Sequence, residues 1–374
     1  MTDPASATAL ETVGANSTRL WGLTMAERNA RIGRKASLGG SGAPVVLANA
    51  RFAADPAWLT HVAAHPGMVL TLGGAPAIAH ARDEHEAALL RSAMRDETAL
   101  GEPERFNFLP FETGGTIENR ALRKREQPFL IELTPDTRRA IERASYVGAY
   151  KGVTDLLTKY LWPEWALWLT RLAARLGLSP NMVTTIGAVL CVLATVCFAY
   201  GHYWIGLALG LVFMVLDTVD GKLARCTITS SWWGNVFDHG MDLVHPPFWW
   251  WFWATGLSHV GLALSDTLFW WVEGAIFAGY IVQRAIEGAF IARFGGIHIH
   301  VWERFDSRFR LVTARRNPNM VILFASLVVS RPDIGIVAVA VWTVLSCGVH
   351  LVRLFQALAR QRRGETIRSW LADA

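Results

Sequence analysis

The sequence is poor in charged residues. Asp, Glu, Lys and Arg make up 18% of its 374 residues, whereas 52% are hydrophobic. Since soluble domains average about 25% charged residues, this composition excludes a disordered or nucleic-acid-coating chain and disfavours a wholly soluble one. Charge is missing altogether from residues 181–216, 243–265 and 334–352. A transmembrane helix needs about 20 predominantly apolar residues, so part of the chain is expected to lie in a bilayer.

The sequence is also poor in cysteine. Its four cysteines show no C-x-x-C spacing, which argues against a disulfide framework and against a zinc site. Residues 1–31 contain no continuous apolar run, so no cleavable signal peptide is predicted and the front of the chain is expected to stay in the cytoplasm. The net charge of +5 fits basic cytoplasmic loops better than a nucleic-acid partner.

The apolar segments predict six transmembrane helices, at residues 181–200, 203–225, 237–257, 267–290, 317–330 and 334–355. Six arginines lie in the segment 293–316 between the fourth and fifth helices, and only Arg331 stands in a loop on the other side. This bias places both termini, and an active site on that side, in the cytoplasm. The predicted fold class is therefore an all-α polytopic protein of the cell (inner) membrane, preceded by a small cytoplasmic α/β domain.

Two domains are predicted, at 1–145 and 146–374. The first should alternate strands, expected at 45–48, 68–72 and 128–133, with helices, expected at 56–64 and 82–104. The second opens with an amphipathic zone, 146–177, where tryptophans stand among Lys and Arg. That composition is typical of a helix lying at a membrane interface.

Four aspartates stand in or beside the second and third predicted spans, where charge is costly. Asp217, Asp220, Gly221 and Ala224 occupy positions i, i+3, i+4 and i+7, which form one stripe of a helix. Ionisable residues inside a membrane are candidates for function. The small residues Gly221 and Ala224 leave room on that stripe for a ligand to approach the backbone.

The third predicted span repeats the arrangement. Gly234, Asp238 and Asp242 stand at i, i+4 and i+8, again on one stripe. If the two helices face each other, four carboxylates converge, and they stay ionised together only with cations between them. Two Mg²⁺ or Mn²⁺ ions fit this role, and the nearby Arg225 suits a phosphate-bearing substrate. The alternatives are the cation path of a membrane transporter and a structural charge network.

These residues resemble the signature of the CDP-alcohol phosphotransferase family, D-x2-D-G-x2-A-R-x8-G-x3-D-x3-D. All eight fixed positions match, with the eight-residue gap intact, and the resemblance extends over about residues 150–360. It implies a six-helix membrane enzyme, a homodimer, that works with Mg²⁺ or Mn²⁺. Such an enzyme transfers a substituted phosphate group from a CDP-alcohol to an acceptor alcohol and releases CMP, in phospholipid or polar-lipid biosynthesis, with one of the two alcohols a lipid.

The resemblance also implies roles for single residues. Asp217, Asp220 and Asp238 would bind metal, and Asp242 would be the catalytic base and a further metal ligand. The residues that would hold the CDP moiety are Asp217, Gly221, Ala224, Arg225, Gly234 and Thr184, the last of them at the entry to the first span. No motif position is lost, which disfavours a pseudoenzyme.

The arginines before the fifth span allow two interpretations. The positive-inside bias and contact with lipid headgroups explain them as well as a phosphate clamp does. As a clamp, Arg315 and Arg316, the nearest to the membrane, would bind a phosphate of the acceptor. His298 and His300 are expected in a solvated loop rather than at a metal.

The front domain resembles the nucleotidyltransferase domains that are fused ahead of some members of this family. It lacks a Gly-rich phosphate loop of the G-x-G-T-R type near an N-terminal strand. We therefore expect this domain to be non-catalytic.

Overall fold

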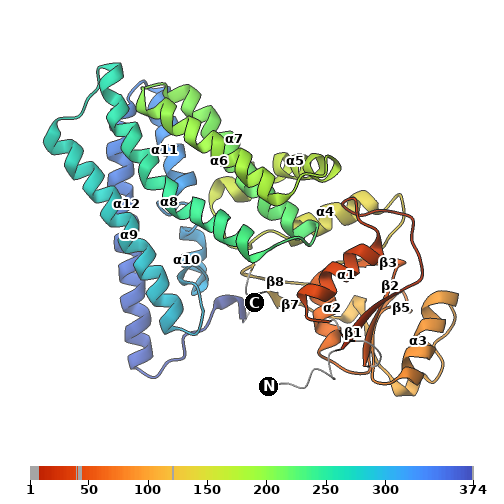
Figure 1. The fold of residues 1–374 in the computed structure, drawn as a ribbon. Coiled ribbons are helices and arrows are strands. Elements are labelled where there is room, and N and C mark those ends of the chain that lie inside the picture. Colours follow the sequence, from red (N-terminus) through yellow and green to blue (C-terminus); the bar gives the residue numbers. More distant parts are fainter. Residues whose placement is uncertain (1–7, 39, 41–43, 120–121, 373–374) are drawn as a thin grey trace.

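The computed structural model describes residues 8–38, 40, 44–119 and 122–372, and of residues 118, 119, 235, 238 and 239 it describes the backbone alone. Two parts of the chain lie next to each other in Figure 1. The part up to residue 133 contains the strands and is called the sheet domain below. The part from residue 180 onward contains the long helices and is called the helix bundle.

The sheet domain is built on a mixed five-stranded sheet in the order β1-β2-β5-β4-β6. The outer pairs β1–β2 and β4–β6 are parallel, and β5 pairs antiparallel with both of its neighbours. Every residue of β2 is buried, so both faces of the sheet are covered at its centre. The strands are β1 (Ala9–Val13), β2 (Val45–Asn49), β4 (Met68–Leu72), β5 (Ala75–Ala81) and β6 (Asn107–Pro110).

Three helices and two further strand pairs complete this domain. The helices are α1 (Met25–Lys35), α2 (Pro56–Ala63) and α3 (Glu84–Asp96), and the antiparallel pairs are β3 (Phe52–Ala54) with β9 (Leu130–Glu132) and β7 (Ile117–Asn119) with β8 (Lys124–Glu126). The strands and the first helix expected from the sequence are present as β2, β4, β9 and α2.

The second predicted helix of this domain, at 82–104, is shorter in the structure. α3 ends at Asp96, because Glu97 adopts a left-handed backbone conformation with φ 54°. A 3-10 turn, η2 (Pro103–Arg105), begins at Pro103, whose ring cannot continue an α-helix.

The helix bundle reproduces the six predicted apolar segments. They are α6 (Pro180–Ala199), α7 (Tyr203–Cys226), α8 (Trp232–Gly256), α9 (Asp266–Arg293), α11 (Arg316–Val328) and α12 (Pro332–Arg362). Within the described residues, α6, α7, α9 and α12 are long and apolar enough to cross a membrane. α11 has only 13 residues, and α8, which carries two of the four aspartates, is not among the helices that meet this measure.

Shorter elements connect the two parts. The chain leads into α6 through α4 (Arg138–Gly148), η4 (Leu157–Leu161) and α5 (Pro163–Arg175), and α4 spans the predicted domain boundary at 145. Within the bundle, η6 (Ile299–Val301) and α10 (Arg304–Phe309) lie between α9 and α11. Leu20 and Trp21 of the sheet domain belong to the same hydrophobic cluster as Val219 and Leu223 of α7. The two parts therefore share a core.

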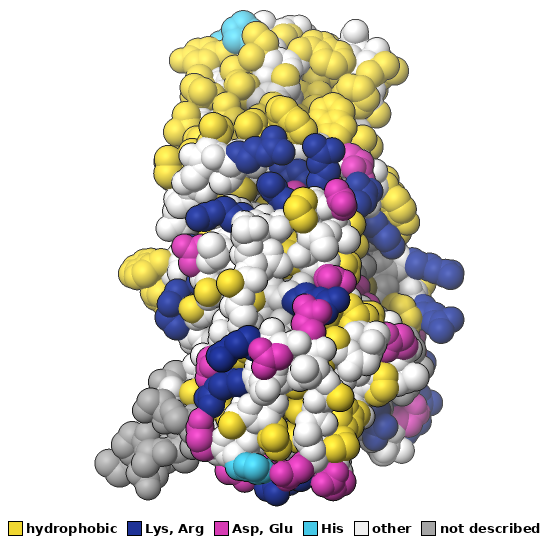
Figure 2. Space-filling view, turned by 90° about the vertical axis from the view of Figure 1, so that its right-hand side faces the viewer, with side chains coloured by type: hydrophobic (Ala, Val, Ile, Leu, Met, Phe, Trp, Pro, Cys, Tyr) yellow, Lys and Arg dark blue, Asp and Glu magenta, His cyan; other side chains and the backbone are white. Residues whose placement is uncertain are grey.

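The surface changes character along the long axis of the bundle. In Figure 2, hydrophobic side chains cover the upper part of this face, and Lys and Arg gather directly below them. Further down, acidic and basic side chains are mixed. A band of cations beneath an apolar cap is typical of the boundary between a bilayer and the cytoplasm.

Candidate functional site

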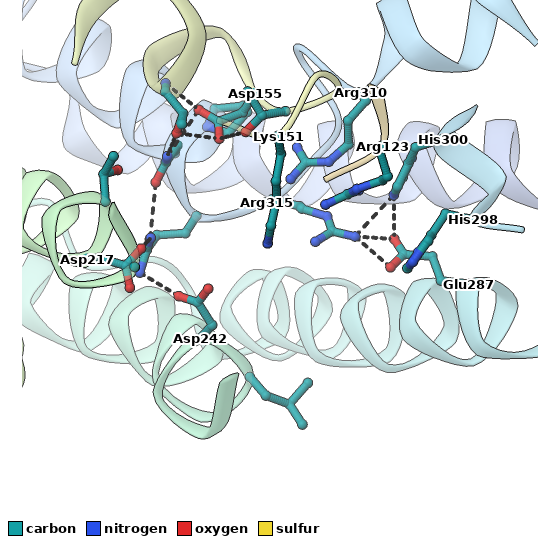
Figure 3. Close-up of a pocket in the computed structure, with 18 of the residues that line it drawn as sticks. Arg123, Lys151, Asp155, Asp217, Asp242, Glu287, His298, His300, Arg310 and Arg315 are labelled. Atoms are coloured by element: carbon teal, nitrogen blue, oxygen red, sulfur yellow. Dashed lines mark hydrogen bonds and ion pairs between the residues drawn. The ribbon is translucent and has the colours of Figure 1, made fainter. Parts of the chain in front are cut away.

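A cavity of about 450 Å³ opens where the helix bundle meets the sheet domain. Side chains of α7, α8, α9 and the start of α11 line it, and Arg123 reaches it from the turn between β7 and β8. Its described lining includes eight Lys or Arg and four Asp or Glu. Figure 3 shows Asp217 and Asp242 at one end and Glu287 at the other, with basic side chains between them.

At the acidic end, two aspartates from different helices meet one arginine. Arg316 Nη2 lies 2.6 Å from Asp217 Oδ2 on α7, and Arg316 Nη1 lies 2.8 Å from Asp242 Oδ1 on α8. The two aspartates therefore converge, as their helical spacing predicts. Asp217 is mostly buried, whereas the side chain of Asp242 is 50% exposed and can be reached from the cavity.

Asp220 lies deeper, at 3% exposure. Thr184 Oγ1, from the first turns of α6, donates a hydrogen bond to Asp220 Oδ2 at 2.5 Å, and the backbone N–H of Gly221 donates to Asp220 Oδ1 at the same distance. The start of α6 therefore contacts the aspartate motif through Thr184, one of the residues that the sequence predicts at the CDP site. The side chain of Asp238 lies outside the described part of the structure.

Two other motif residues lie at close approaches. A Cβ on Gly234 would stand 3.2 Å from Asn181 Oδ1, so the missing side chain lets α8 approach the start of α6. Arg225 Nε donates to the carbonyl of Ala149 at 3.1 Å, which holds that guanidinium at the wall of the cavity beside Gly221. Ala224, one turn from Asp220, is half-buried.

The donor set at the acidic end fits Mg²⁺ or Mn²⁺. It consists of carboxylate oxygens, the ligands these hard cations prefer. Two facing carboxylates need a cation between them, and here the guanidinium of Arg316 supplies the positive charge that Asp217 and Asp242 share.

The middle of the cavity is basic. Arg123, Lys151, Arg310 and Arg315 point into it in Figure 3. Burial, with repulsion from Arg315, lowers the pKa of Arg310 to about 9 and that of Arg123 to about 10. Arg310 belongs to the basic segment that the sequence marks between the fourth and fifth spans, whereas nothing in the local sequence marks Arg123.

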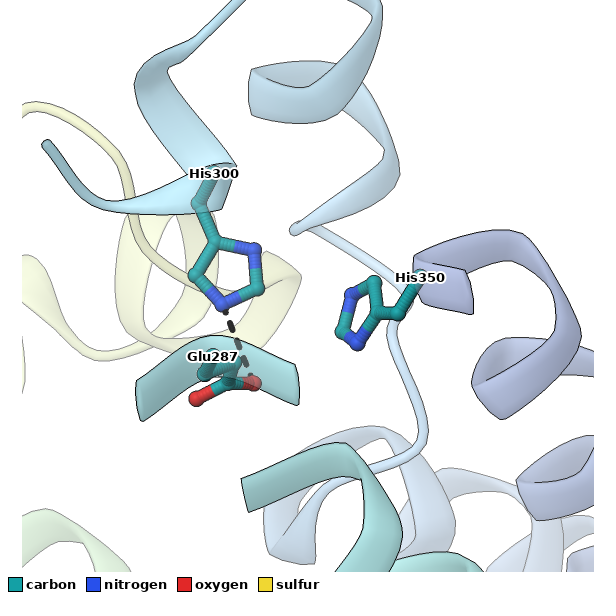
Figure 4. Close-up of side chains that lie close together, drawn as sticks. All are labelled: Glu287, His300 and His350. Atoms are coloured by element: carbon teal, nitrogen blue, oxygen red, sulfur yellow. Dashed lines mark ion pairs between the residues drawn. The ribbon is translucent and has the colours of Figure 1, made fainter. Parts of the chain in front are cut away.

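Glu287 holds Arg315 in place. Arg315 Nη2 lies 2.6 and 2.5 Å from the two carboxylate oxygens of Glu287 and 3.2 Å from His300 Nε2. Glu287, His300 and His350 offer ligand atoms within 4.8 Å of one another (Figure 4), as a metal site would. Since Arg315 contacts both the carboxylate and the imidazole of His300, and His300 Nε2 lies 3.3 Å from Glu287 Oε1, we interpret this cluster as an ion pair that positions Arg315.

The expectation of a solvated loop at His298 and His300 is wrong for His300. This residue is 3% exposed and lies in η6. The segment packs its apolar residues Ile299 and Trp302 against Phe290 of α9 in one hydrophobic cluster, which draws the neighbouring imidazole inside.

Asp155 fixes the start of α11. Its carboxylate accepts hydrogen bonds from the backbone and side chain of Thr158, at 3.0 and 2.8 Å, and from Asn317 Nδ2 at 3.0 Å. Burial raises the pKa of Asp155, but the charge of Arg310 and these hydrogen bonds outweigh burial, so the pKa lies below its usual value. Arg315 and Arg316 directly precede Asn317, so this network also helps to position them.

Comparison with known proteins agrees with the geometry. A family model for CDP-alcohol phosphatidyltransferase matches residues 177–347. Cholinephosphotransferase 1 of Xenopus laevis is 29% identical over 177 residues, which are 44% of this chain and 41% of that protein. The bifunctional IPC transferase and DIPP synthase of Rubrobacter xylanophilus is 30% identical over 165 residues, 43% of this chain and 34% of that protein.

The similarity is confined to part of each relative. The chain spans 21%, 36% and 41% of the length of three cholinephosphotransferases that it matches. A solved structure, phosphatidylinositol phosphate synthase of Mycobacterium tuberculosis with manganese and citrate, aligns over 51% of this chain and 88% of its own, at 18% identity and a TM-score of 0.41. Residues 177–347, which contain the whole aspartate motif, are the part of this chain that matches the CDP-alcohol phosphatidyltransferase family.

Proposed function

We propose that this protein is an integral-membrane transferase that moves a substituted phosphate group from a CDP-alcohol to an acceptor alcohol and releases CMP. The pathway would be phospholipid or polar-lipid biosynthesis, with one of the two alcohols a lipid. The observation that carries the proposal is the complete eight-position motif on α7 and α8, with Asp217 and Asp242 facing one cation at the wall of a cavity.

The aspartates would bind the metal. Asp217, Asp220, Asp238 and Asp242 would hold two Mg²⁺ or Mn²⁺ ions, which would neutralise the phosphates and stabilise the attacking and leaving oxygens. Arg316 now pairs with two of these carboxylates. We propose that Arg316 turns to a substrate phosphate when metal takes its place.

Asp242 would act as the general base. It is half-exposed and lines the cavity, so an acceptor hydroxyl can reach it. Asp242 takes the hydroxyl proton, the hydroxyl oxygen forms a bond to the β-phosphorus of the donor, and the bond from that phosphorus to the CMP oxygen breaks. General-base catalysis of this kind contributes about 10²- to 10⁴-fold in rate.

The remaining motif residues would hold the CDP moiety. Gly221 and Ala224 leave room beside α7, and Gly234 allows a close approach of α8 to α6. Arg225 supplies a cation at the cavity wall. Thr184, which hydrogen-bonds Asp220, and Asp217 complete the expected set.

Arg315 and Arg316 are proposed to bind a phosphate of the acceptor. Bidentate pairing with a phosphate depends on the planar guanidinium and is lost on exchange for Lys. Arg315→Lys or Arg316→Lys should therefore raise the KM for a phosphate-bearing substrate while expression and membrane insertion stay unchanged. Wild-type KM values in both variants would leave these arginines with a topological and lipid-contact role.

Six membrane spans are proposed, formed by α6, α7, α8, α9, α11 and α12, with both termini in the cytoplasm and the protein in the cell (inner) membrane as a homodimer. The apolar cap and the basic band below it support this orientation. α5 supports it too, because Trp165 and Trp168 are 68% and 64% exposed there, as tryptophans at a membrane interface are.

The deciding experiment measures CMP release. Purified protein in lipid vesicles is given CDP-choline, CDP-ethanolamine or CDP-diacylglycerol with Mn²⁺ or Mg²⁺, and the lipid product is identified by mass. The first two donors are suggested by the cholinephosphotransferases and a choline/ethanolaminephosphotransferase among the relatives. CMP release from one donor, abolished in Asp217→Asn, supports the proposal. In Asp242→Asn the CDP-alcohol should still bind while transfer stops.

The main rival is a cation transporter that uses the aspartates as its ion path. It predicts uptake of Mn²⁺ into the vesicles without CMP release, and that result would overturn the proposal. A chain that binds CDP-alcohols but neither transfers nor transports would be a pseudoenzyme.

A further inference from the structure

We propose that the sheet domain supplies part of the substrate-binding site. In this proposal, which rests on the proposed function, Arg123 binds an anionic group, a phosphate or carboxylate, on a substrate alcohol, together with Arg310 of the helix bundle. The sheet domain would then be a specificity element of the transferase.

The turn that carries Arg123 is docked against the chain that leads into the bundle. The backbone N–H of Gly152 donates to the carbonyl of Leu122 at 2.8 Å. A Cβ on Gly152 would lie 2.6 Å from the carbonyl oxygen of Arg123 and 2.8 Å from Cβ of Lys124, so only glycine permits this contact. On the other side of the hairpin, Arg125 Nη1 donates to the carbonyl of Ala372 at 2.8 Å.

The backbone of Arg123 is itself unusual. Its φ is 52°, in the left-handed region that residues other than glycine rarely adopt. Strained residues of this kind persist where surrounding structure holds them, and they concentrate at functional sites. Here the docked hairpin holds the strained residue, and the side chain points into the cavity (Figure 3).

Several guanidinium nitrogens near Arg123 have no acceptor among the described residues. Arg310 is 8% exposed, and within the described residues its buried Nε and Nη1 have no hydrogen-bond partner; the same holds for Nε of Arg315. Within the described part of the chain, the side chain of Arg123 also forms no hydrogen bond or ion pair. Since buried donors are normally paired, nitrogens left open in one cavity point to an acceptor that comes with a ligand.

The charge balance specifies the sign of that ligand. Eight basic and four acidic side chains line the cavity, and Glu287 is already paired with Arg315. A tetrahedral phosphate or a planar carboxylate offers several oxygens to guanidinium groups that converge. An uncharged alcohol would bring no charged acceptor to the open nitrogens of Arg310 and Arg315.

The first test uses inorganic phosphate as the probe, so that it does not depend on turnover. The thermal midpoint of the full-length protein in detergent is measured against phosphate concentration for wild type, Arg123→Gln, Arg123→Lys and Arg34→Gln. Arg34 is a matched control, because it is an exposed arginine of the sheet domain that does not line the cavity. We expect Arg123→Gln to weaken phosphate binding by about 10- to 100-fold, the loss of one charge-assisted hydrogen bond, with partial rescue in Arg123→Lys.

The second test uses the reaction. Arg123→Gln should raise the KM of one substrate, the one carrying the anion, and leave kcat within a few-fold, whereas Arg34→Gln should behave as wild type. A rise for the CDP-alcohol assigns the anion to the donor, and a rise for the second substrate assigns it to the acceptor. Wild-type phosphate binding and KM values in Arg123→Gln would overturn the inference. Arg123-dependent phosphate binding without CMP release from any CDP-alcohol would instead overturn the proposed function.

Discussion

Arg316 holds together two aspartates that repulsion would otherwise separate. Its guanidinium bridges Asp217 and Asp242 at 2.6 and 2.8 Å, the carboxylates that we expect to bind metal. A cation in that position competes with a divalent ion, because like charges a few ångströms apart repel strongly in a partly buried site.

Replacing Arg316 should therefore strengthen metal binding. We expect Arg316→Gln to bind Mn²⁺ on the order of tenfold more tightly than wild type, from the loss of one nearby positive charge, even though its transferase activity falls. Electron paramagnetic resonance titration of free Mn²⁺ measures this. Arg315→Gln is the control, because Arg315 pairs with Glu287 instead. Equal Mn²⁺ affinity in wild type and Arg316→Gln would show that Arg316 and metal do not compete.

Asp155 should make stability depend on pH in a known direction. Its pKa is lower in the folded protein than the usual value of about 3.9. The stabilisation is therefore fully present above about pH 4 and is lost as the pH falls through the folded pKa. Asp155→Asn should lower the free energy of unfolding by about 1–3 kcal/mol at pH 7, as expected for weakened hydrogen bonds to a buried charge.

Thermal unfolding at pH 7 and pH 3 checks this prediction. The difference between wild type and Asp155→Asn should shrink at the lower pH, because the carboxyl of the unfolded chain is then largely protonated while the folded protein resists taking up that proton. The exposed Asp136 provides the control, and Asp136→Asn should match wild type at pH 7. A difference that persists undiminished at pH 3 would assign the effect to lost geometry instead of lost charge.

Among the helices, a close backbone contact joins the end of α8 to the end of α6 and the turn that follows it. A Cβ on Gly256 would lie 1.9 Å from the carbonyl oxygen of Phe198, and one on Gly201 would lie 3.1 Å from the carbonyl oxygen of Gly256. Small residues at helix contacts in membranes allow backbones to approach this closely. The helices that carry the two halves of the aspartate motif are tied together at this end.

Gly256→Ala should separate these helices. Because the obstacle is backbone and cannot rotate away, we expect a loss of about 1–3 kcal/mol in stability, the usual cost of overpacking. The comparison is Gly274→Ala on α9, where an added Cβ meets nothing within 4 Å and the thermal midpoint should stay at the wild-type value. A wild-type midpoint in Gly256→Ala would mean that the backbones of α6 and α8 can move apart at this end at little cost in stability.

At the scale of the whole molecule, two patterns support the proposed membrane topology. Apolar side chains cover one end of the bundle, and Lys and Arg gather directly below them (Figure 2). If all six proposed spans cross the membrane, we expect the loop after α8 to lie outside the cell and the end of α12 to lie inside.

Reporter fusions test this topology. In a bacterial host, alkaline phosphatase fused after Gly261 should be active, and the same fusion after Gly364 should be inactive although expressed. Green fluorescent protein at the two positions should give the reverse pattern. Active phosphatase after Gly364 would mean an odd number of spans, with α8 or α11 not crossing the membrane.

The sheet domain and the helix bundle are expected to unfold together. They share a hydrophobic cluster that includes Trp21 and Leu223, and Trp21 Nε1 donates to Ser145 Oγ at 2.8 Å. A chain cut at the predicted boundary of 145 would be broken inside α4 and would expose this cluster. The domain assignment itself, with a non-catalytic sheet domain, stays a prediction.

The six apolar segments and the aspartate motif could be recognised from the sequence by itself. Both are local patterns, since hydropathy over 20 residues marks a helix and i, i+3, i+4 spacing places Asp217 and Asp220 on one stripe whatever surrounds them. The motif's match to a family depended only on spacing. The local pattern nevertheless predicted too long a helix at 82–104, because Glu97, in a left-handed conformation, ends α3 at Asp96.

Only the tertiary structure decided which charges meet in the cavity. Arg316 reaches Asp217 across 99 positions of sequence, and Arg123 enters the cavity from another domain. His300, expected in solvent, is buried beside Glu287 because its apolar neighbours pack against α9. Contacts of this kind depend on how separate elements pack against one another. Because packing balances burial, charge repulsion and hydrogen bonding over the whole chain, no short stretch of sequence determines these contacts.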